Sequence, residues 1–347
     1  HIKAYQEIGH EVFVVAPKDD YSDDLIRLGV NIYSFTINPK GVNPFQELIT
    51  FFKILKIYFI IKPDYIMNFT PKMNIYSSFA GFICRAKIIN NITGLGIVFS
   101  ERTRFKSFVM LLYKFSQLFA TKVFFQNQFD MQYFNRKKIV SPKKSDLLPG
   151  SGVDLNEFSP VEAKNDNIVR FIIICRMLYS KGLTLYADAA SLLKIKYGKS
   201  VEFIAVGFIE DDKESIPRSL MTEWQDSGQI IFKGALKDIR PELANADCIV
   251  LPSFYPEGMP RSLLEAAAMG KPIITTKTPG CSATVDDEKN GFLCEPKSLD
   301  NLIEKLEKMI AMGHKGRIDM GRLSRNKALK EFDEKIVINK YLQCLES

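Results

Sequence analysis

The sequence predicts an α/β protein with two domains, each built on a doubly wound parallel sheet. The chain has 347 residues, which is enough for two domains of ordinary size. Short apolar segments alternate with longer helix-like segments through both halves, and this alternation is typical of parallel sheets covered by helices. A stretch rich in Gly, Ser and Asp over 149–158, followed by polar residues to 167, indicates the connection between the halves.

The expected domains cover residues 1–150 and 151–330, and a C-terminal helix over 331–347 is expected to pack back on the first domain. In the first half, the predicted strands are 11–16, 64–69, 87–92 and 122–125. The predicted helices are a short one ending near Gly9 and longer ones over 45–61, 73–84 and 104–119. Because the chain starts at His1 without a methionine, we expect it to be a fragment that lacks its true start.

The second half repeats the same rhythm of short apolar and longer amphipathic segments. Its predicted strands are 169–175, 201–206, 230–233, 248–252 and 273–276. Its predicted helices are 184–196, 299–312 and 316–332, with a further short helix before Gly270. Ligands bind such sheets at the carboxyl ends of the strands, so the residues that directly follow each strand are the first candidates for a site.

The most informative segment is 251–274, where two carboxylates flank a Gly-Met-Pro turn that opens a helix. Pro260 is expected at the first helical position, because its missing N–H costs nothing there. Gly270 is expected to end the helix in the left-handed conformation. Glu257 therefore lies in the loop after a buried strand, and Glu265 lies in the second turn of the helix.

This arrangement favours a ligand that carries both a phosphate and hydroxyl groups. A helix N-terminus offers unpaired N–H groups and a partial positive charge to a phosphate, and carboxylates can accept hydrogen bonds from hydroxyls. A nucleotide sugar has both kinds of group. The alternative is an ordinary strand–loop–helix of any α/β protein.

Two cations follow the first predicted strand of the second half. Arg176 stands at the carboxyl end of that strand, and Lys181 follows before Gly182 and a helix. Arg supplies a rigid fork of donors and Lys a mobile point charge, so together they could hold a diphosphate and neutralise it as it leaves. The alternative is a pair of solvated loop cations.

Together these motifs resemble those of retaining glycosyltransferases with the GT-B fold, which form glycosyltransferase family 4, also called glycosyl transferases group 1. The E-x7-E pair and the Arg and Lys before it are the family's features. Further matches, which extend the resemblance through nearly the whole chain, are Gly152-Val153-Asp154, Phe158, Gly280 and Asn290-Gly291. The resemblance implies two Rossmann-like domains that face each other across a cleft.

A narrower resemblance is to bacterial enzymes that add N-acetylhexosamines or related sugars to undecaprenyl-diphosphate-linked glycans for capsule, O-antigen or protein glycosylation. The segments that carry it are 69–72, 92–99, 258–265 and 279–281. It implies a UDP-sugar donor, a lipid-linked glycan acceptor and transfer with retention of the anomeric configuration.

The resemblance also implies residue roles in the second domain. Glu257, Arg176 and Lys181 are the catalytic candidates: the two cations would bind the donor diphosphate, and the carboxylate would face the reacting carbon of the donor sugar. Glu265 would accept hydrogen bonds from the ribose. The donor-binding candidates are Arg176, Lys181, Gly234, Glu257, Gly258, Met259, Pro260, Ser262, Leu263 and Glu265. Gly234, which would lie by the nucleobase, is equally well explained as a turn glycine.

The first domain departs from the family pattern. Many members place a histidine near the donor sugar, but the corresponding stretch 90–96 contains none, which leaves the first-domain catalytic contact unassigned. The acceptor-side candidates are Thr70, Lys72, Thr93, Gly94 and Gly96.

No metal or cofactor is expected. The sequence has no D-x-D triplet, its three histidines are scattered, and its six cysteines form no C-x-x-C pair. Cations and a helix dipole would take the place of a divalent metal, and the cysteines are expected to be reduced thiols of a cytosolic protein.

The basic charge of the chain lies in its first half. Residues 1–150 hold 20 Lys and Arg against 11 Asp and Glu, whereas residues 151–347 hold 27 against 29. Such asymmetry indicates an anionic partner for the first half. The predicted partner is an anionic membrane surface, reached from the cytoplasm by peripheral attachment to the inner face, because no segment is apolar and long enough to span a bilayer. Nucleic acid is not expected, since no recognised reading motif is present.

The segment 102–119 could serve that attachment. Its apolar residues recur at helical spacing and basic residues decorate it, which is typical of a helix lying in a headgroup layer. Those apolar residues are Phe105, Phe108, Val109, Leu112, Phe115 and Phe119. The alternative is that this stripe packs on a core.

Two other classes of function remain open from the sequence. One is a catalytically inactive transferase that acts as an assembly scaffold, against which the intact Arg176, Lys181, Glu257 and Glu265 argue. The other is a dinucleotide-dependent oxidoreductase, which would require a G-x-G-x-x-G turn after a strand. No such turn is present in the chain given.

Overall fold

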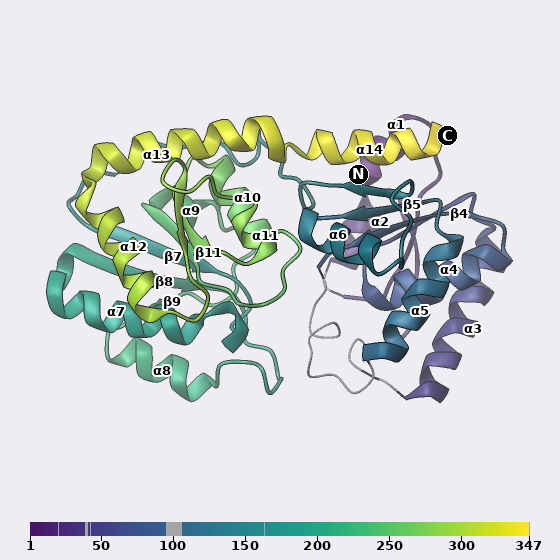
Figure 1. Ribbon diagram of the computed structural model, residues 1–347, viewed down its shortest axis with the longest axis horizontal. Helices are drawn as coiled ribbons and strands as arrows, with labels where there is room; N and C mark the ends of the chain where they lie inside the picture. The colour runs from purple at the N-terminus through teal and green to yellow at the C-terminus, as the bar shows by residue number, and fades with distance from the viewer. Residues whose placement is uncertain (20, 39–40, 42, 95–105, 163, 347) are drawn as a thin grey trace. The chain divides into compact units, whose positions relative to one another are not determined.

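A computed structural model describes residues 1–19, 21–38, 41, 43–94, 106–162 and 164–346 of the chain. These residues form two compact units, each an α/β unit with parallel strands (Figure 1). Of the described residues, unit 1 holds 1–93, 106–147 and 337–346, and unit 2 holds 94 and 148–336. None of the helices in the described part of the chain is long and apolar enough to cross a membrane.

Unit 2 is built on one parallel sheet of six strands in the order β12-β11-β10-β7-β8-β9. The strands are β7 Val169–Ile174, β8 Val201–Val206, β9 Ile231–Phe232, β10 Cys248–Leu251, β11 Ile273–Thr276 and β12 Gly291–Cys294. The helices are α7 Leu183–Tyr197, α8 Arg218–Asp226, α9 Arg240–Asn245, α10 Arg261–Ala268, α11 Pro279–Ser282, α12 Leu299–Ala311 and α13 Gly313–Lys327, which continues as a π-helical turn over Ala328–Phe332.

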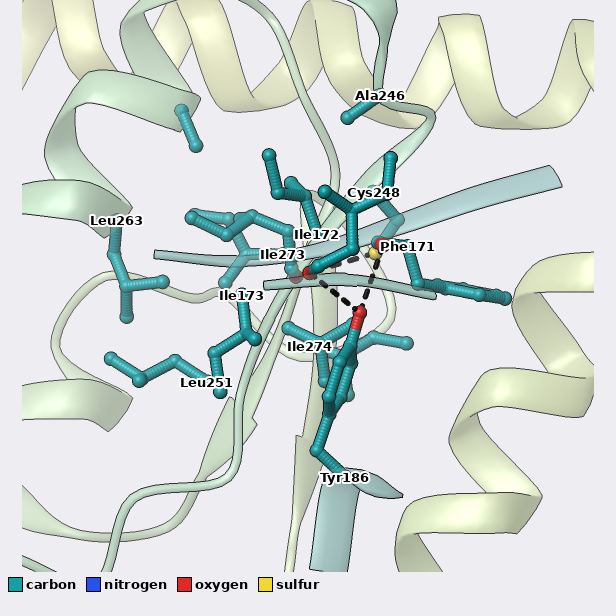
Figure 2. Close-up of a cluster of buried hydrophobic side chains, with 14 of the residues drawn as sticks. Phe171, Ile172, Ile173, Tyr186, Ala246, Cys248, Leu251, Leu263, Ile273 and Ile274 are labelled. Atoms are coloured by element: carbon teal, nitrogen blue, oxygen red, sulfur yellow. Dashed lines mark hydrogen bonds between the residues drawn. The ribbon is translucent and has the colours of Figure 1, made fainter. Parts of the chain in front are cut away.

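The hydrophobic core of unit 2 is one continuous cluster of buried side chains. Its central strands are buried on both faces, as expected for a parallel sheet covered by helices. Figure 2 shows Ile172, Ile173 and Ile273 packed together in this cluster. The buried hydroxyl of Tyr186 on α7 donates to the carbonyl of Phe171 at 2.8 Å, so even this polar atom is satisfied.

Unit 1 contains two parallel sheets among its described residues, β1-β2 and β3-β4-β5-β6. The strands are β1 Phe13–Val15, β2 Asn31–Tyr33, β3 Tyr65–Asn68, β4 Lys87–Ile92, β5 Lys122–Phe125 and β6 Ser145–Leu147. The helices are α1 Ile2–Glu7, α2 Ser22–Arg27, α3 Pro44–Ile61, α4 Pro71–Ile83, α5 Lys106–Phe119, α6 Gln128–Arg136 and, from residue 337, α14 Glu334–Glu346. The side-chain amide of Asn91 donates to the Tyr341 hydroxyl at 2.9 Å, which ties α14 to β4.

The interior of unit 1 is unusually polar. Asn90 of β4 donates to Ser78 of α4 at 2.9 Å and to Gln117 of α5 at 2.8 Å, and it accepts from Asn68 of β3 at 2.8 Å. All four side chains are buried. Hydrogen bonds, rather than apolar packing alone, therefore join α4 and α5 to this sheet.

The structure corrects one expectation drawn from the sequence and distinguishes between two alternatives that the sequence left open. Pro260 is the N-cap of α10, with φ −65° and ψ 120°, so the helix starts one residue later than predicted. In α5 the apolar stripe does not simply pack on a core, because Phe108 and Phe115 are exposed. Phe105 lies outside the described residues. Gly270, with φ +68°, ends α10 as predicted.

Candidate active site

The carboxyl edge of the unit 2 sheet divides between β7 and β10. From β7 the chain runs to β8 and β9 on one side, and it then returns to β10, β11 and β12 on the other. The loops that follow β7 and β10 therefore diverge from neighbouring strands, which is the position where open α/β sheets bind ligands.

Lys181 reaches this edge from the loop after β7. It ends a single 3₁₀ turn over Tyr179–Lys181, and Gly182 follows in the left-handed conformation with φ +80°. A Cβ at Gly182 would overlap the carbonyl oxygen of Pro252, which follows β10. Glycine at this position therefore lets the two loops approach closely and brings Lys181 beside the loop that carries Glu257.

The Lys181 ammonium forms an ion pair with Oε1 of Glu257. The two side chains are only 10% and 11% exposed, so their charges are poorly screened by water. The buried Ser253 hydroxyl donates to the same Glu257 oxygen at 3.0 Å, and the Tyr255 ring lies 5.3 Å from the ammonium. These contacts fix a cation and an anion side by side.

A third strand supports the Glu257 loop from the other side. Thr276, the last residue of β11, donates its hydroxyl to the carbonyl of Ser253 at 2.5 Å. Gly280 at the start of α11 lies so close to the loop that a Cβ there would overlap the carbonyl oxygen of Gly258. Small residues after β11 therefore hold the segment 253–258 in place.

Arg176 lies near the same pair but has another partner. Its guanidinium contacts Oε1 of Glu210, in the loop after β8, at 3.1 Å. Burial raises the pKa of the neighbouring Cys175 thiol to about 12, and this pKa also responds to the charges of Lys181, Glu257 and Arg176. The charges of Lys181, Glu257 and Arg176 therefore all act on one thiol, which directly follows β7.

Glu265 lies apart from that cluster along α10. It is buried, and it accepts from the Arg261 guanidinium at 2.7 Å, one turn earlier on the helix. Burial raises the pKa of the Glu265 carboxyl, while the hydrogen bond and charge of Arg261 oppose that rise. The structure thus brings Lys181 and Glu257 together, and it leaves Glu265 with a separate cation.

The remaining donor-side candidates differ in what they present. The amides of Arg261 and Ser262 open α10 and have no acceptor within the helix, whereas the Leu263 amide donates to the Pro260 carbonyl at 3.1 Å and the Leu263 side chain is wholly buried. Met259 packs against the apolar core. Gly234, after β9, has φ +68° and open space at its Cβ position.

Among the described acceptor-side candidates, Lys72 has several partners within unit 1. The Lys72 ammonium donates to the carbonyls of Asn38 and Gly41 and pairs with Glu47 at 2.5 Å, so this side chain ties α4 to α3 and to the preceding loop. Thr70 is the N-cap of α4, and Thr93 is exposed. Gly94 has φ +119°, and Gly96 lies outside the described residues.

Sequence reasoning missed the partners of the charged candidates, namely Glu210, Ser253 and Arg261. Ser253 could have been found, because it directly follows the predicted strand that leads to Glu257. Glu210 and Arg261 carried no such indication. In the described part of the chain, no group of three or more His, Cys, Asp or Glu residues could hold a metal ion, and no disulfide joins the cysteines.

With this geometry established, comparison with known families gives two matches. Residues 154–327 match the family model described as glycosyl transferases group 1. Residues 1–127 match the model described as glycosyl transferase 4-like. The two matches together cover both halves of the chain.

Curated relatives cover most of the chain. An N,N'-diacetylbacillosaminyl-diphospho-undecaprenol alpha-1,3-N-acetylgalactosaminyltransferase of Campylobacter jejuni is 29% identical over 99% of this chain and 93% of its own length. A UDP-Gal:alpha-D-GlcNAc-diphosphoundecaprenol alpha-1,3-galactosyltransferase of Escherichia coli is 27% identical over 84% of this chain and 76% of its own length.

Solved structures confirm the predicted GT-B fold. HepE of Anabaena in complex with UDP and glucose has a TM-score of 0.80 and 18% identity over 99% of this chain and 94% of its own. A glycosyltransferase of Rickettsia africae has a TM-score of 0.78 and 20% identity over 98% and 91% of the two chains.

Proposed function

This chain belongs to the family of glycosyl transferases group 1, and from that premise we propose that it transfers a sugar from a UDP-sugar to an undecaprenyl-diphosphate-linked glycan. The sugar is an N-acetylhexosamine or a related hexose, and the product serves a bacterial surface polysaccharide or glycoprotein glycan. The Campylobacter and Escherichia coli relatives, whose names include such acceptors, support the acceptor class. The HepE complex with UDP and glucose supports the donor class.

The observation that carries this proposal is the desolvated Lys181–Glu257 pair at the division of the sheet. An ammonium has three N–H donors, so Lys181 can keep its bond to the carboxylate and still donate to a phosphate oxygen. Arg176 adds a second cation, and the first amides of α10 add dipoles that favour an anion. These groups would stabilise the diphosphate as it leaves.

Glu257 has the complementary role. Lys181 and Ser253 hold its carboxylate at a fixed position, from which it can orient the donor sugar and stabilise positive charge at the reacting carbon. Glu265, supported by Arg261, supplies a carboxylate for the ribose hydroxyls. The acceptor hydroxyl then attacks the reacting carbon from the face that the diphosphate leaves and passes its proton to the departing diphosphate, so the anomeric configuration is retained without a metal.

Attachment to the membrane follows from the proposed acceptor. A lipid-linked glycan lies at a bilayer surface, and the excess positive charge of residues 1–150 favours an anionic leaflet. The basic residues 136–138 and 143–144 of unit 1 contribute to that charge. We therefore propose a cytoplasmic protein peripherally attached to the inner face of the membrane.

The test is a transfer assay with a panel of nucleotide sugars and an undecaprenyl-diphosphate-linked acceptor. Mass spectrometry identifies the product, and NMR of its anomeric proton reports retention or inversion. Lys181→Ala should lose a charged hydrogen bond of roughly 1.5–3 kcal/mol, which slows transfer by about one to two orders of magnitude if that bond forms in the transition state.

Lys196→Ala is the matched control, because Lys196 is an exposed lysine of α7 in an ion pair with Glu307. An unchanged rate in Lys181→Ala would contradict the assignment of this site. Binding of UDP-sugar without transfer or hydrolysis would favour the alternative of an inactive scaffold. The family match argues against the oxidoreductase alternative.

A further inference from the structure

Helix α5 of unit 1 buries several polar side chains and exposes several large apolar ones. Tyr113, Ser116 and Gln117 are buried. The residues that are about half or more exposed are Phe108, Leu111, Phe115 and Leu118, which recur on one helical face. A surface helix in water normally shows the opposite pattern, so this face is suited to a surrounding other than water.

Helix α3 repeats this inverted pattern on the other side of α4. Thr50 and Tyr58 are among its buried residues. Its exposed apolar residues are Phe45, Leu48, Ile49, Phe52, Phe59 and Ile60. Lys53 and Lys56 are exposed on the same helix. Since α4 packs against both α3 and α5 (Figure 1), the three helices form one layer of unit 1.

The buried hydrogen bonds prevent these helices from turning their apolar faces inward. Tyr58 of α3 bonds to Ser77 of α4 at 2.5 Å, and Gln117 of α5 accepts from Asn90 of β4 at 2.8 Å. Rotation of α3 or α5 would leave these buried groups unsatisfied, which is costly. The outward direction of the phenylalanines is therefore a fixed property of the unit.

A pocket of about 560 Å³ lies at the C-terminal ends of α3 and α4. Its charged lining is Lys62, Asp64, Arg85 and Lys87, with His10 beside them. The lining therefore carries three cations and one carboxylate. This excess of positive charge favours an anionic ligand. Phe59 and Ile83 also line the pocket, and both are exposed apolar side chains of α3 and α4, so the basic pocket is continuous with the apolar residues at these helix ends.

We propose that this pocket binds the phosphate headgroup of an anionic phospholipid while Phe59, Ile60, Phe82 and Ile83 enter the boundary with the acyl chains. A lipid of this kind presents an anion directly beside apolar chains, which is the combination that the pocket and its rim offer. A soluble phosphate would use the cations but not the phenylalanine and isoleucine side chains. The exposed lysines of α3 suit the same anionic surface.

This inference deepens the membrane attachment in the proposed function, and it rests on that attachment alone. It concerns unit 1, whereas the transfer chemistry is assigned to unit 2. Vesicle binding is measured without any sugar donor, so its failure would leave the transfer chemistry assigned to unit 2 standing, and loss of transfer would leave the lipid pocket standing.

The experiment is flotation of the full chain with vesicles of phosphatidylcholine alone and of phosphatidylcholine with phosphatidylglycerol. We expect binding to the anionic vesicles only. Each cation near an anionic surface contributes about fivefold in partitioning, so Arg85→Gln with Lys87→Gln should weaken binding by about 25-fold. Lys3→Gln with Lys18→Gln is the control, because it removes two exposed charges of unit 1 that belong neither to the pocket nor to the basic residues 136–138 and 143–144. Equal losses of vesicle binding in the two double variants would contradict the proposal that the pocket binds the headgroup.

The apolar part of the proposal has its own variants. Phe59→Ser should weaken vesicle binding at high salt, where screening removes most of the charge contribution. Phe129→Ser, at a phenylalanine of α6 with similar exposure, should not. Equal effects of the two variants would contradict the proposal that the helix ends insert into the membrane.

A competition experiment distinguishes a lipid from a free phosphate. Full displacement from vesicles by millimolar glycerol phosphate would show a site for free phosphate and would contradict the lipid assignment. Binding to neither kind of vesicle would also contradict it. Thermal melts confirm that each surface variant is folded.

Discussion

The two units differ in the side chains that they bury and in those that they expose. Unit 2 buries a large apolar core and has charged groups at both ends of its strands: Lys181 and Glu257 meet at the carboxyl ends, and Asp247 before β10 pairs with the buried Arg317. Unit 1 buries amides and hydroxyls around Asn90 and exposes phenylalanines on α3 and α5. The difference indicates what each unit faces: a polar ligand at the sheet edge of unit 2, and an apolar surrounding beside the helices of unit 1.

The largest expected effect tests the apolar core of unit 2. Phe203 of β8 is wholly buried and stacks on Phe171, with ring centroids 5.2 Å apart. Phe203→Ala should lower the free energy of unfolding of unit 2 by about 3–5 kcal/mol, measured by differential scanning calorimetry. Phe208→Ala, at an exposed phenylalanine of the same unit, should cost less than about 1 kcal/mol. Similar costs for the two variants would contradict the core described here.

The next effect tests the polar interior of unit 1. Asn90→Ala leaves Ser78 and Gln117 buried with unmade hydrogen bonds, and it should lower the free energy of unfolding by about 2–4 kcal/mol. Asn31→Ala, at an exposed asparagine of β2, should cost less than about 0.5 kcal/mol. If chemical denaturation shows no difference between these variants, the network does not hold α4 and α5 in place.

A smaller effect comes from a buried carboxyl in unit 1. Burial raises the pKa of Asp130 from 3.8 to about 6, against a hydrogen bond from Asn127. The folded state therefore binds this proton more tightly than the unfolded state, and stability falls as the pH rises from about 4 to above 6. Asp130→Asn should raise the free energy of unfolding by about 1–3 kcal/mol at pH 8 and have little effect at pH 4.

Asp146 provides the opposite case within the same unit. Burial opposes its ionisation, but hydrogen bonds from Lys340 and Leu147 and nearby positive charge outweigh burial and lower the pKa of this carboxyl. Its stabilising contribution is present at neutral pH and is lost as the pH falls through the lowered pKa. Asp146→Asn should therefore destabilise the protein at pH 8. Changes of the same sign in the two variants would contradict both assignments.

The smallest expected effect concerns Glu210, which forms an ion pair with Arg176 that a diphosphate could replace. The ion pair with Glu210 is partly exposed, and such pairs contribute about 0.2–1 kcal/mol. Glu210→Gln should release Arg176 for a diphosphate and tighten UDP binding by about two- to fivefold in isothermal titration calorimetry. Glu214→Gln, an exposed change in the same loop, should leave the affinity unchanged. Weaker binding in Glu210→Gln would show that Glu210 positions the cation instead of competing for it.

The sequence predicted many of the long or strongly apolar elements, but helices α6 and α8 and strand β12 were not predicted. Strands β4, β5, β8 and β11 have the predicted bounds, because buried runs between charged or turn residues leave little choice. Strands β2 and β6 span three residues each and were missed, since so short a segment has no recognisable period. Pro260 was displaced by one position because its fixed φ fits both the helix and the residue before it.

The sequence indicated the site residues that follow the central strands, but it did not indicate the residues that contact them. Lys181 and Glu257 were paired correctly as candidates because each follows a strand that lies centrally in a parallel sheet. Their neighbours Glu210 and Arg261 depend on loop and rotamer geometry that no local pattern encodes. For α5 the sequence left two alternatives open, since helical spacing identifies an apolar face but not whether that face is buried, and the structure exposes Phe108 and Phe115.

One measurement tests most directly whether unit 2 binds the donor and unit 1 binds the membrane. It is hydrogen–deuterium exchange of the full chain with UDP and, separately, with anionic vesicles. We predict that UDP slows exchange in unit 2 at 176–182 and 253–263, and that vesicles slow exchange in unit 1 at 59–62 and 83–87. Protection of the unit 2 segments by vesicles, or of the unit 1 segments by UDP, would contradict the account.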